Sequence, residues 1–216
     1  AVSAALPHRP GARRAFLLGH PLGGRLAVEA GLVHPRSVRG LALLTPSPAF
    51  RRLRSLVPLV RLLRPELAAL PVPVPHAVVV EVIRAMLSEP SRLPDAWYAA
   101  AADECVRVFR SPAHRLAFWS CSRQIFVEPS HGRNGFWDRL PSLQPPALFI
   151  WGDRDRLVPA GFARHVAEAV PSAKSVVLQD SGHVPQFEHR KQTTALVRAM
   201  LHPLPDPARP AAHRAA

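Results

Sequence analysis

A chain of 216 residues is long enough for one domain with a well-formed core, or for a core with a modest insertion. Hydrophobic residues make up 48% of it and charged residues 20%, a composition that excludes a disordered chain. The net charge of +13 comes almost entirely from arginine, but no zinc-finger spacing or RNA-binding motif accompanies it. We therefore expect arginine-rich solvated surfaces and no nucleic-acid partner.

No stretch of the sequence predicts a membrane span or a leader. Residues 1–14 hold two prolines and three arginines in place of a continuous apolar core, and the apolar stretch 67–80 is interrupted by three prolines. Cys105 and Cys121 lie in separate helical segments, which favours free thiols in a reducing compartment over a disulfide. These features predict a cytoplasmic protein that does not bind membranes.

The first structured segment is a strand followed by a helix. Residues 16–19 form a short continuous apolar run, typical of a strand buried on both faces of a parallel sheet. Apolar residues then recur at helical spacing over 22–33, and Gly23 and Gly24 should let the first turn approach the strand closely. A second buried strand is predicted over 38–44.

Residues 48–141 show a different pattern, with helical spacing and no strand signal. Helices are predicted over 76–87, 95–109 and 113–127, separated by prolines. A helical block between two strands of an α/β pattern indicates an inserted cap. Its aromatic residues are candidates for the wall of an apolar pocket, or else for ordinary core packing: Phe118, Trp119, Phe126, Phe136 and Trp137.

The α/β pattern returns after the cap. Strands are predicted over 147–151 and 175–178, and helices over 160–170 and 191–201. The chain is thus divided into a first part of the α/β core at 1–47, a helical cap at 48–141, a second part of the core at 142–202, and a flexible proline-rich tail at 203–216.

Three loops at predicted strand ends carry the candidate chemistry. Gly19-His20-Pro21-Leu22-Gly23 has the glycines of a nucleophile elbow, G-x-S-x-G, with proline at the position of the nucleophile. Asp155 follows the third strand and His183 follows the fourth, so both should reach the same edge of a parallel sheet.

Other roles are open for these residues. Asp153 or Asp155 could cap the helix that follows. His183 could be a turn residue, and His20 could be a strand-end residue with an accessible ring or a replacement nucleophile. No metal-ligand spacing is found among the remaining histidines.

Taken together, these motifs resemble those of the α/β-hydrolase superfamily, in the cap-bearing branch of esterases, lactonases and carbon–carbon bond hydrolases. The resemblance covers residues 14–201 and implies a partial α/β-hydrolase fold, with about four parallel strands flanked by helices and an inserted helical cap. It implies a small apolar ester, lactone or acyl substrate, hydrolysed by a Ser-Asp-His triad without cofactor or metal.

The resemblance also implies a role for each site residue. Asp155 matches the triad acid and His183 the general base. Leu22 stands where the family uses a backbone N–H for the oxyanion hole. The elbow is formed by Gly19, His20 and Gly23, around Pro21.

Two departures from the family pattern bear on activity. Pro21 has no hydroxyl, and its φ is fixed near −65°, so the elbow should relax into a helix start and displace the Leu22 N–H. Only 20 residues precede Pro21, which is too few for the early strands of the family. The elbow strand should then be an exposed sheet edge that invites self-association.

Three hypotheses about function follow from these observations. The chain is a family hydrolase that is weak or inactive, because its nucleophile is missing. Alternatively, it is a non-catalytic protein that binds a ligand or a partner. In a third alternative, Asp155 and His183 activate water without the elbow serine.

Overall fold

The structure is a computed structural model that describes residues 14–47, 57–62, 64, 66, 67, 70 and 74–201. All structural statements below concern these residues. The expectations for residues 1–13, for the start of the cap at 48–56 and for a flexible tail at 203–216 lie outside them.

The core is a sheet of four parallel strands in the order β1-β2-β3-β4. The strands are β1 (Ala15–Gly19), β2 (Val38–Leu44), β3 (Ala147–Gly152) and β4 (Lys174–Leu178). Each lies within one residue of the range predicted from the sequence. The predicted α/β fold with four parallel strands is confirmed.

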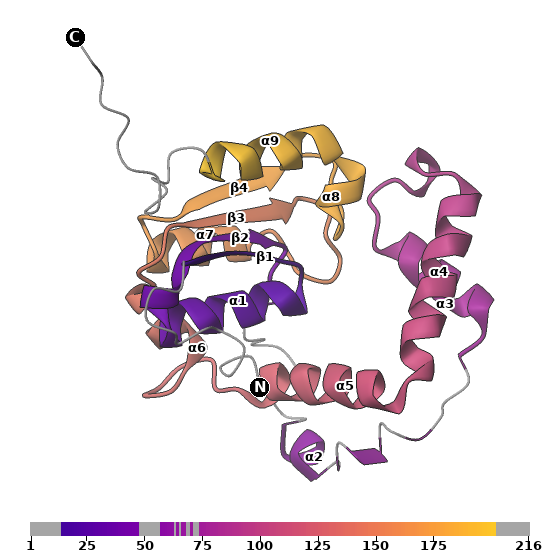
Figure 1. The fold of residues 1–216 in the computed structure, drawn as a ribbon, viewed down its shortest axis with the longest axis horizontal. Coiled ribbons are helices and arrows are strands. Elements are labelled where there is room, and N and C mark those ends of the chain that lie inside the picture. The colour runs from indigo at the N-terminus through magenta and orange to yellow at the C-terminus, as the bar shows by residue number, and fades with distance from the viewer. Residues whose placement is uncertain are drawn as a thin grey trace.

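Helices cover both faces of this sheet (Figure 1). On one face, α1 (Leu22–Val33), α6 (Phe136–Arg139) and α7 (Phe162–Ala169) pack on alternate residues of the two central strands. On the other face, α9 (Arg190–Leu201) packs on the intervening residues. This alternation buries β2 and β3 on both sides, which explains why they are continuous apolar runs.

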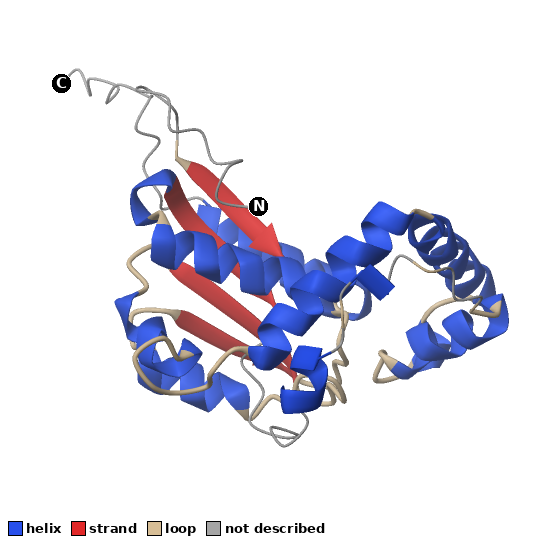
Figure 2. Ribbon diagram, turned by 90° about the horizontal axis from the view of Figure 1, so that it is seen from below, coloured by secondary structure: helices blue, strands red, loops and turns tan. Residues whose placement is uncertain are grey.

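A group of helices projects to one side of the sheet (Figure 2). It consists of α2 (Val57–Leu62), α3 (His76–Ala85), α4 (Asp95–Arg110) and α5 (Pro112–Val127). The short helix α8 (Pro185–Glu188) precedes α9, and 3-10 turns occur at Pro35–Ser37, Pro90–Arg92 and Leu140–Ser142. The predicted cap helices are therefore present, and α3 ends two residues earlier than expected.

The end of the predicted cap segment packs with the sheet rather than with the cap helices. Phe136 and Trp137 on α6 are buried in the same cluster as the α1 face of the sheet, and Trp137 stacks on Phe162 of α7 at 5.9 Å. Of the two alternatives for Phe136 and Trp137, ordinary core packing is confirmed. Their helical spacing alone could not distinguish a core face from a pocket face. Phe118 and Trp119 lie largely exposed on α5.

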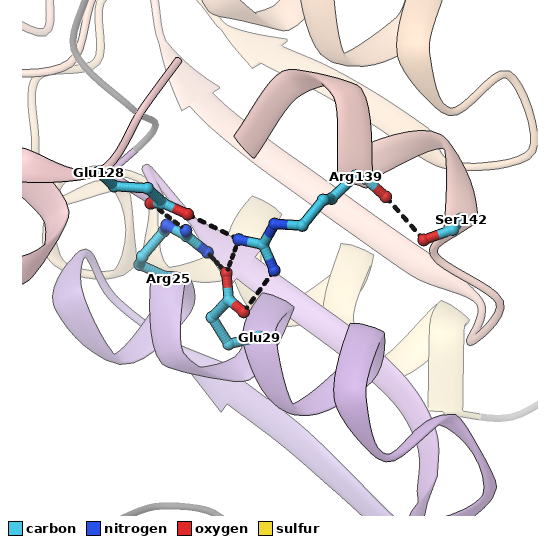
Figure 3. A network of polar contacts seen from close by, with 5 residues as sticks. All are labelled: Arg25, Glu29, Glu128, Arg139 and Ser142. Carbon is cyan, nitrogen blue, oxygen red and sulfur yellow. Dashed lines mark hydrogen bonds and ion pairs between the residues drawn. The ribbon is translucent and has the colours of Figure 1, made fainter. Parts of the chain in front are cut away.

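Four charged side chains connect α1 to the end of α5 and to α6 (Figure 3). Arg25 and Glu29 of α1 pair at 2.5 Å, and Arg25 also pairs with Glu128 at the C-cap of α5. Arg139 of α6 contacts Glu29 at 2.7 Å and Glu128 at 2.6 Å. This charge cluster (Arg25, Glu29, Glu128 and Arg139) holds the base of the cap against the helix that begins at the elbow.

The charges in this cluster depend on one another. Burial alone would raise the pKa of Glu29, but hydrogen bonds and charge from Arg139 and Arg25 outweigh it and hold that pKa below its ordinary value. The Arg25 guanidinium is 3% exposed and also lies 4.2 Å from the centre of the Phe136 ring. Removal of either arginine would leave the two carboxylates of Glu29 and Glu128 to share one guanidinium.

Candidate active site

Asp155 lies in the loop after β3, and its side chain is completely buried. One carboxylate oxygen, Oδ1, accepts hydrogen bonds from the backbone N–H groups of Leu157 (2.8 Å) and Val158 (2.9 Å). The other oxygen, Oδ2, lies 2.8 Å from Nδ1 of His183. The carboxylate is therefore satisfied by the local turn and by one imidazole, as a buried charge requires.

Neither acid of this loop caps the next helix. Helix α7 begins at Phe162, and its N-cap is Gly161, which makes no side-chain capping bond. The exposed Asp153 instead accepts a hydrogen bond from the backbone N–H of Ser181 at 3.1 Å. The helix-cap alternative is wrong, because the acids face the histidine loop rather than the start of α7.

His183 lies in the loop after β4 and is held on both its ring and its backbone. Donation from Nδ1–H to Asp155 leaves the lone pair on Nε2, which is the tautomer that a general base needs. The backbone N–H of His183 donates to the carbonyl of Met86 at 2.7 Å, and its own carbonyl accepts from His20 and Thr45. The sequence prediction that Asp155 and His183 meet at one sheet edge agrees with this geometry.

Thr45 belongs to the site although the sequence analysis did not select it. It follows β2 directly and adopts a left-handed conformation with φ of 39°, which is uncommon for a residue with a branched side chain. Its hydroxyl donates to the His183 carbonyl at 3.1 Å. The only sequence signal was a polar residue, followed by proline, at the end of a buried strand.

The elbow in this chain is an ordinary, unstrained start of helix α1. Pro21 has φ of −71° and ψ of −38°, so it lies in the right-handed helical region. Its carbonyl accepts hydrogen bonds from the backbone N–H groups of Arg25 (3.1 Å) and Ser47 (3.2 Å). Leu22 is the first residue of α1. The strained conformation of a nucleophile elbow is absent at Pro21, and the oxyanion role of Leu22 stays a prediction.

Of Gly19, Gly23 and Gly24, the first has no room for a side chain and the third has little. A Cβ at Gly19 would lie 2.4 Å from the backbone of Gly23 and Gly24, and a Cβ at Gly24 would lie 3.0 Å from Pro46. A Cβ at Gly23 would meet nothing within 4 Å, so the expectation that Gly23 serves close approach is wrong. The strand and the helix touch where Gly19 meets the backbone of Gly23 and Gly24.

His20 connects the elbow to the histidine loop. Its Nε2–H donates to the carbonyl of His183 at 2.7 Å, and the two rings lie 4.9 Å apart at a tilt of 51°. Burial lowers the pKa of His20 to about 4, and the bond to the His183 carbonyl only partly opposes this shift. The ring, at the end of β1, is half-buried and neutral near pH 7, and it is bonded to His183, so it is only partly accessible.

The described residues contain neither a metal-binding cluster nor a membrane-spanning helix. In those segments, no three histidine, cysteine or acidic side chains are grouped so that they could hold a metal. Of the helices in the described ranges, none is long and apolar enough to cross a membrane.

Comparison with known proteins identifies the class to which this chain belongs. A family model described as "alpha/beta hydrolase fold" matches residues 10–190. The chain is therefore a member of the α/β-hydrolase fold family. This agrees with a buried acid–histidine pair at the ends of two strands and an elbow sequence at the end of a third.

Particular relatives include hydrolases and an esterase. A 2-hydroxy-6-oxononadienedioate/2-hydroxy-6-oxononatrienedioate hydrolase from Pseudomonas sp. is 26% identical over 201 residues, which cover 87% of this chain and 62% of the relative. A pimeloyl-[acyl-carrier protein] methyl ester esterase from Xanthomonas oryzae pv. oryzae is 35% identical over 66 residues, 31% of this chain and 26% of the esterase. The chain thus spans less than two thirds of these relatives.

Solved structures share the fold. A meta-cleavage product hydrolase from Pseudomonas fluorescens IP01 matches with a TM-score of 0.66 at 18% identity, over 88% of this chain and 65% of that one. An N-acyl homoserine lactone degrading enzyme matches with a TM-score of 0.62 at 22% identity, over 88% and 68%.

Proposed function

We propose that this chain binds small ester, lactone or acyl compounds and hydrolyses them weakly or not at all. The observation that carries the proposal is the buried Asp155–His183 pair, at 2.8 Å, beside an elbow in which Pro21 continues a right-handed helix. The names of two relatives, a methyl ester esterase and a 2-hydroxy-6-oxononadienedioate/2-hydroxy-6-oxononatrienedioate hydrolase, support hydrolysis of small compounds of this class. Residues 48–141 would form the cap of such a site, in a cytoplasmic protein.

The missing nucleophile sets the expected level of activity. Loss of a serine nucleophile alone typically lowers kcat by about 10⁶. The pair of Asp155 and His183 can still orient an imidazole and accept a proton, but proline offers no oxygen from which to take one. Ligand binding depends on the shape of the site rather than on the nucleophile, so it can persist without turnover.

The test is turnover of a short-chain aryl ester by the purified chain and by the His183→Ala variant. We expect both proteins to match the background rate, while a short-chain methyl ester raises the melting temperature of each. Turnover that disappears in His183→Ala would contradict weak or absent activity. It would instead favour activation of water by Asp155 and His183.

A second candidate, association through the sheet edge, is favoured by the exposure of β1. Within the described residues β1 pairs with β2 alone, and Leu18 of β1 is 60% exposed. An unpaired apolar strand is a template for pairing with a second copy. We expect light scattering to show dimers or larger species, which Leu18→Lys shifts toward monomers. Val33→Lys, at an equally exposed residue on α1, should change nothing, and a monomeric natural chain would contradict the idea.

A further inference from the structure

The turn that ends cap helix α3 lies directly against the histidine loop. The backbone N–H of His183 donates to the carbonyl of Met86 at 2.7 Å. A Cβ on Gly182 would lie 2.5 Å from the Met86 carbonyl oxygen and 2.6 Å from the Ser88 nitrogen. The two backbones are therefore in contact on both sides of the Gly182–His183 peptide, and neither can shift without displacing the other.

One carboxylate joins these two backbones. Oε2 of Glu188 accepts a hydrogen bond from the Ser88 N–H at 2.7 Å, and the Ser88 hydroxyl lies 2.6 Å from the same oxygen. Oε1 of Glu188 accepts from the Gly182 N–H at 2.7 Å. One oxygen of Glu188 thus binds the cap turn, and the other binds the residue before His183. Such bonds to an ionised group are the strong ones.

A weaker contact lies further out on the same loop. The carbonyl of Asp180 accepts from Arg92 at 2.8 Å, and the Ser88 hydroxyl is 2.6 Å from it, so that hydroxyl is shared with Glu188. Both contacts are exposed, whereas the bonds of Glu188 to Ser88 and Gly182 are partly buried. Beside the direct backbone bond from His183 to Met86, Glu188 is therefore the main side-chain connection between the cap turn and the loop.

We infer that Glu188 is a positioning residue that couples the position of the cap to the orientation of the His183 ring. The inference rests on the proposed role of His183 as the base. A movement of α3 would pull on Met86 and Ser88, then on Gly182 and the backbone of His183, and so change the Nδ1 contact with Asp155. A ligand that lifts or settles the cap would then be sensed at the imidazole.

The test uses the natural chain labelled with ¹⁵N-histidine, because ring nitrogen shifts report which nitrogen of His183 carries the proton. In the natural protein we expect the Nδ1–H tautomer to predominate over a minor Nε2–H form. In Glu188→Ala we expect the ratio of Nδ1–H to Nε2–H to fall by about tenfold, the effect of losing a hydrogen bond to a charged group. Glu89→Ala is the matched control, since that carboxylate is exposed and bonds to Ser91.

Ser88→Ala tests the coupling from the cap side and serves also if Glu188→Ala does not fold. It removes the hydroxyl contacts with Glu188 and Asp180 but keeps the bond from the Ser88 N–H, so we expect a two- to threefold fall in the same ratio, in the same direction. An unchanged His183 tautomer in a folded Glu188→Ala or Ser88→Ala protein would overturn the inference. So would an equal change in Glu89→Ala. The ring shifts need no turnover, so a failure of the proposed function is detected separately, in the aryl ester assay.

Discussion

The two halves of the candidate site differ in what they keep. In the acid–histidine half, after β3 and β4, Asp155 and His183 are buried and paired with the geometry that a triad uses. In the elbow half, between β1 and α1, the close glycine contact is present but the nucleophile and its strained turn are not. The packing of a motif and its chemistry are therefore separable in one chain.

In each half, the features that the chain retains also serve the structure of the fold. The Asp155 carboxylate satisfies the backbone N–H groups of Leu157 and Val158, so it would be needed without any reaction. Gly19 is needed wherever the strand touches the helix. A serine in a strained elbow has no such use, since it costs conformational energy and serves only catalysis.

Restoring the nucleophile should produce the largest change. We expect Pro21→Ser to become labelled by a fluorophosphonate at least a hundredfold faster than the natural chain, since removal of a nucleophile costs far more than this. Labelling is measured by mass spectrometry of the intact protein. The double variant Pro21→Ser with His183→Ala should lose the gain. No labelling of Pro21→Ser would mean that the elbow half is lost in its backbone as well as in its side chain.

Breaking the charge cluster tests whether the elbow helix still supports the cap. Arg25→Ala leaves Glu29 and Glu128 facing each other with one arginine, and we expect it to lower the free energy of unfolding by about 3–5 kcal/mol. The free energy is measured by urea unfolding. Arg107→Ala is the control, because it breaks an exposed pair with Glu104 and should leave the midpoint unchanged. Equal effects would show that the cluster adds nothing special.

Removing the charge in the acid–histidine half should have a smaller effect on stability. Asp155→Asn presents an amide to His183 and weakens the bonds to the local turn, so we expect a loss of about 2 kcal/mol in the free energy of unfolding. Asp153→Asn, two residues earlier and exposed, should cost clearly less. An equal loss of unfolding free energy in the two variants would show that the effect of Asp155→Asn does not come from its burial.

His20 bridges the two halves and should make stability depend on pH. Burial lowers its pKa to about 4 from 6.5, so between these values the unfolded chain binds more protons than the folded one. The contribution of His20 is complete above pH 6.5 and is lost as the pH falls towards 4, by roughly 3 kcal/mol. Unfolding in urea at pH 7, 5.5 and 4 measures this loss. His20→Gln should flatten that part of the profile, and an unchanged slope would contradict it.

The sequence predicted the sheet well because of where the sheet lies. Strands buried on both faces must be short apolar runs, and such runs have visible ends. Asp155 and His183 could be found because each follows such a run directly. The other residues of the site could not be predicted, because they depend on contacts between distant segments. Thr45, Met86 and Glu188 contact backbone atoms of His183 or of the residue before it, and such contacts leave no signal in the residue type.

The sequence also could not show which side chains of a helix become buried against other segments. The spacing of Arg25 and Glu29 was visible as a helical pair, but Glu128 and Arg139, more than 90 residues away, complete the cluster. Likewise, nothing local distinguishes Phe136, which packs on the sheet, from Phe118, which lies exposed on the cap. Both outcomes are decided by how the cap docks.

The tight contact at Gly19 has a consequence for how such proteins are sorted. Any side chain there would collide with the start of α1, so this glycine is dictated by the join of strand and helix, whether or not a reaction takes place. A survey that selects catalytic family members by the glycines of the elbow motif would therefore group this chain with active esterases. The backbone conformation at the centre of the elbow is the better criterion, because a nucleophile is presented on a sharp, strained turn, whereas Pro21 lies in the right-handed helical region.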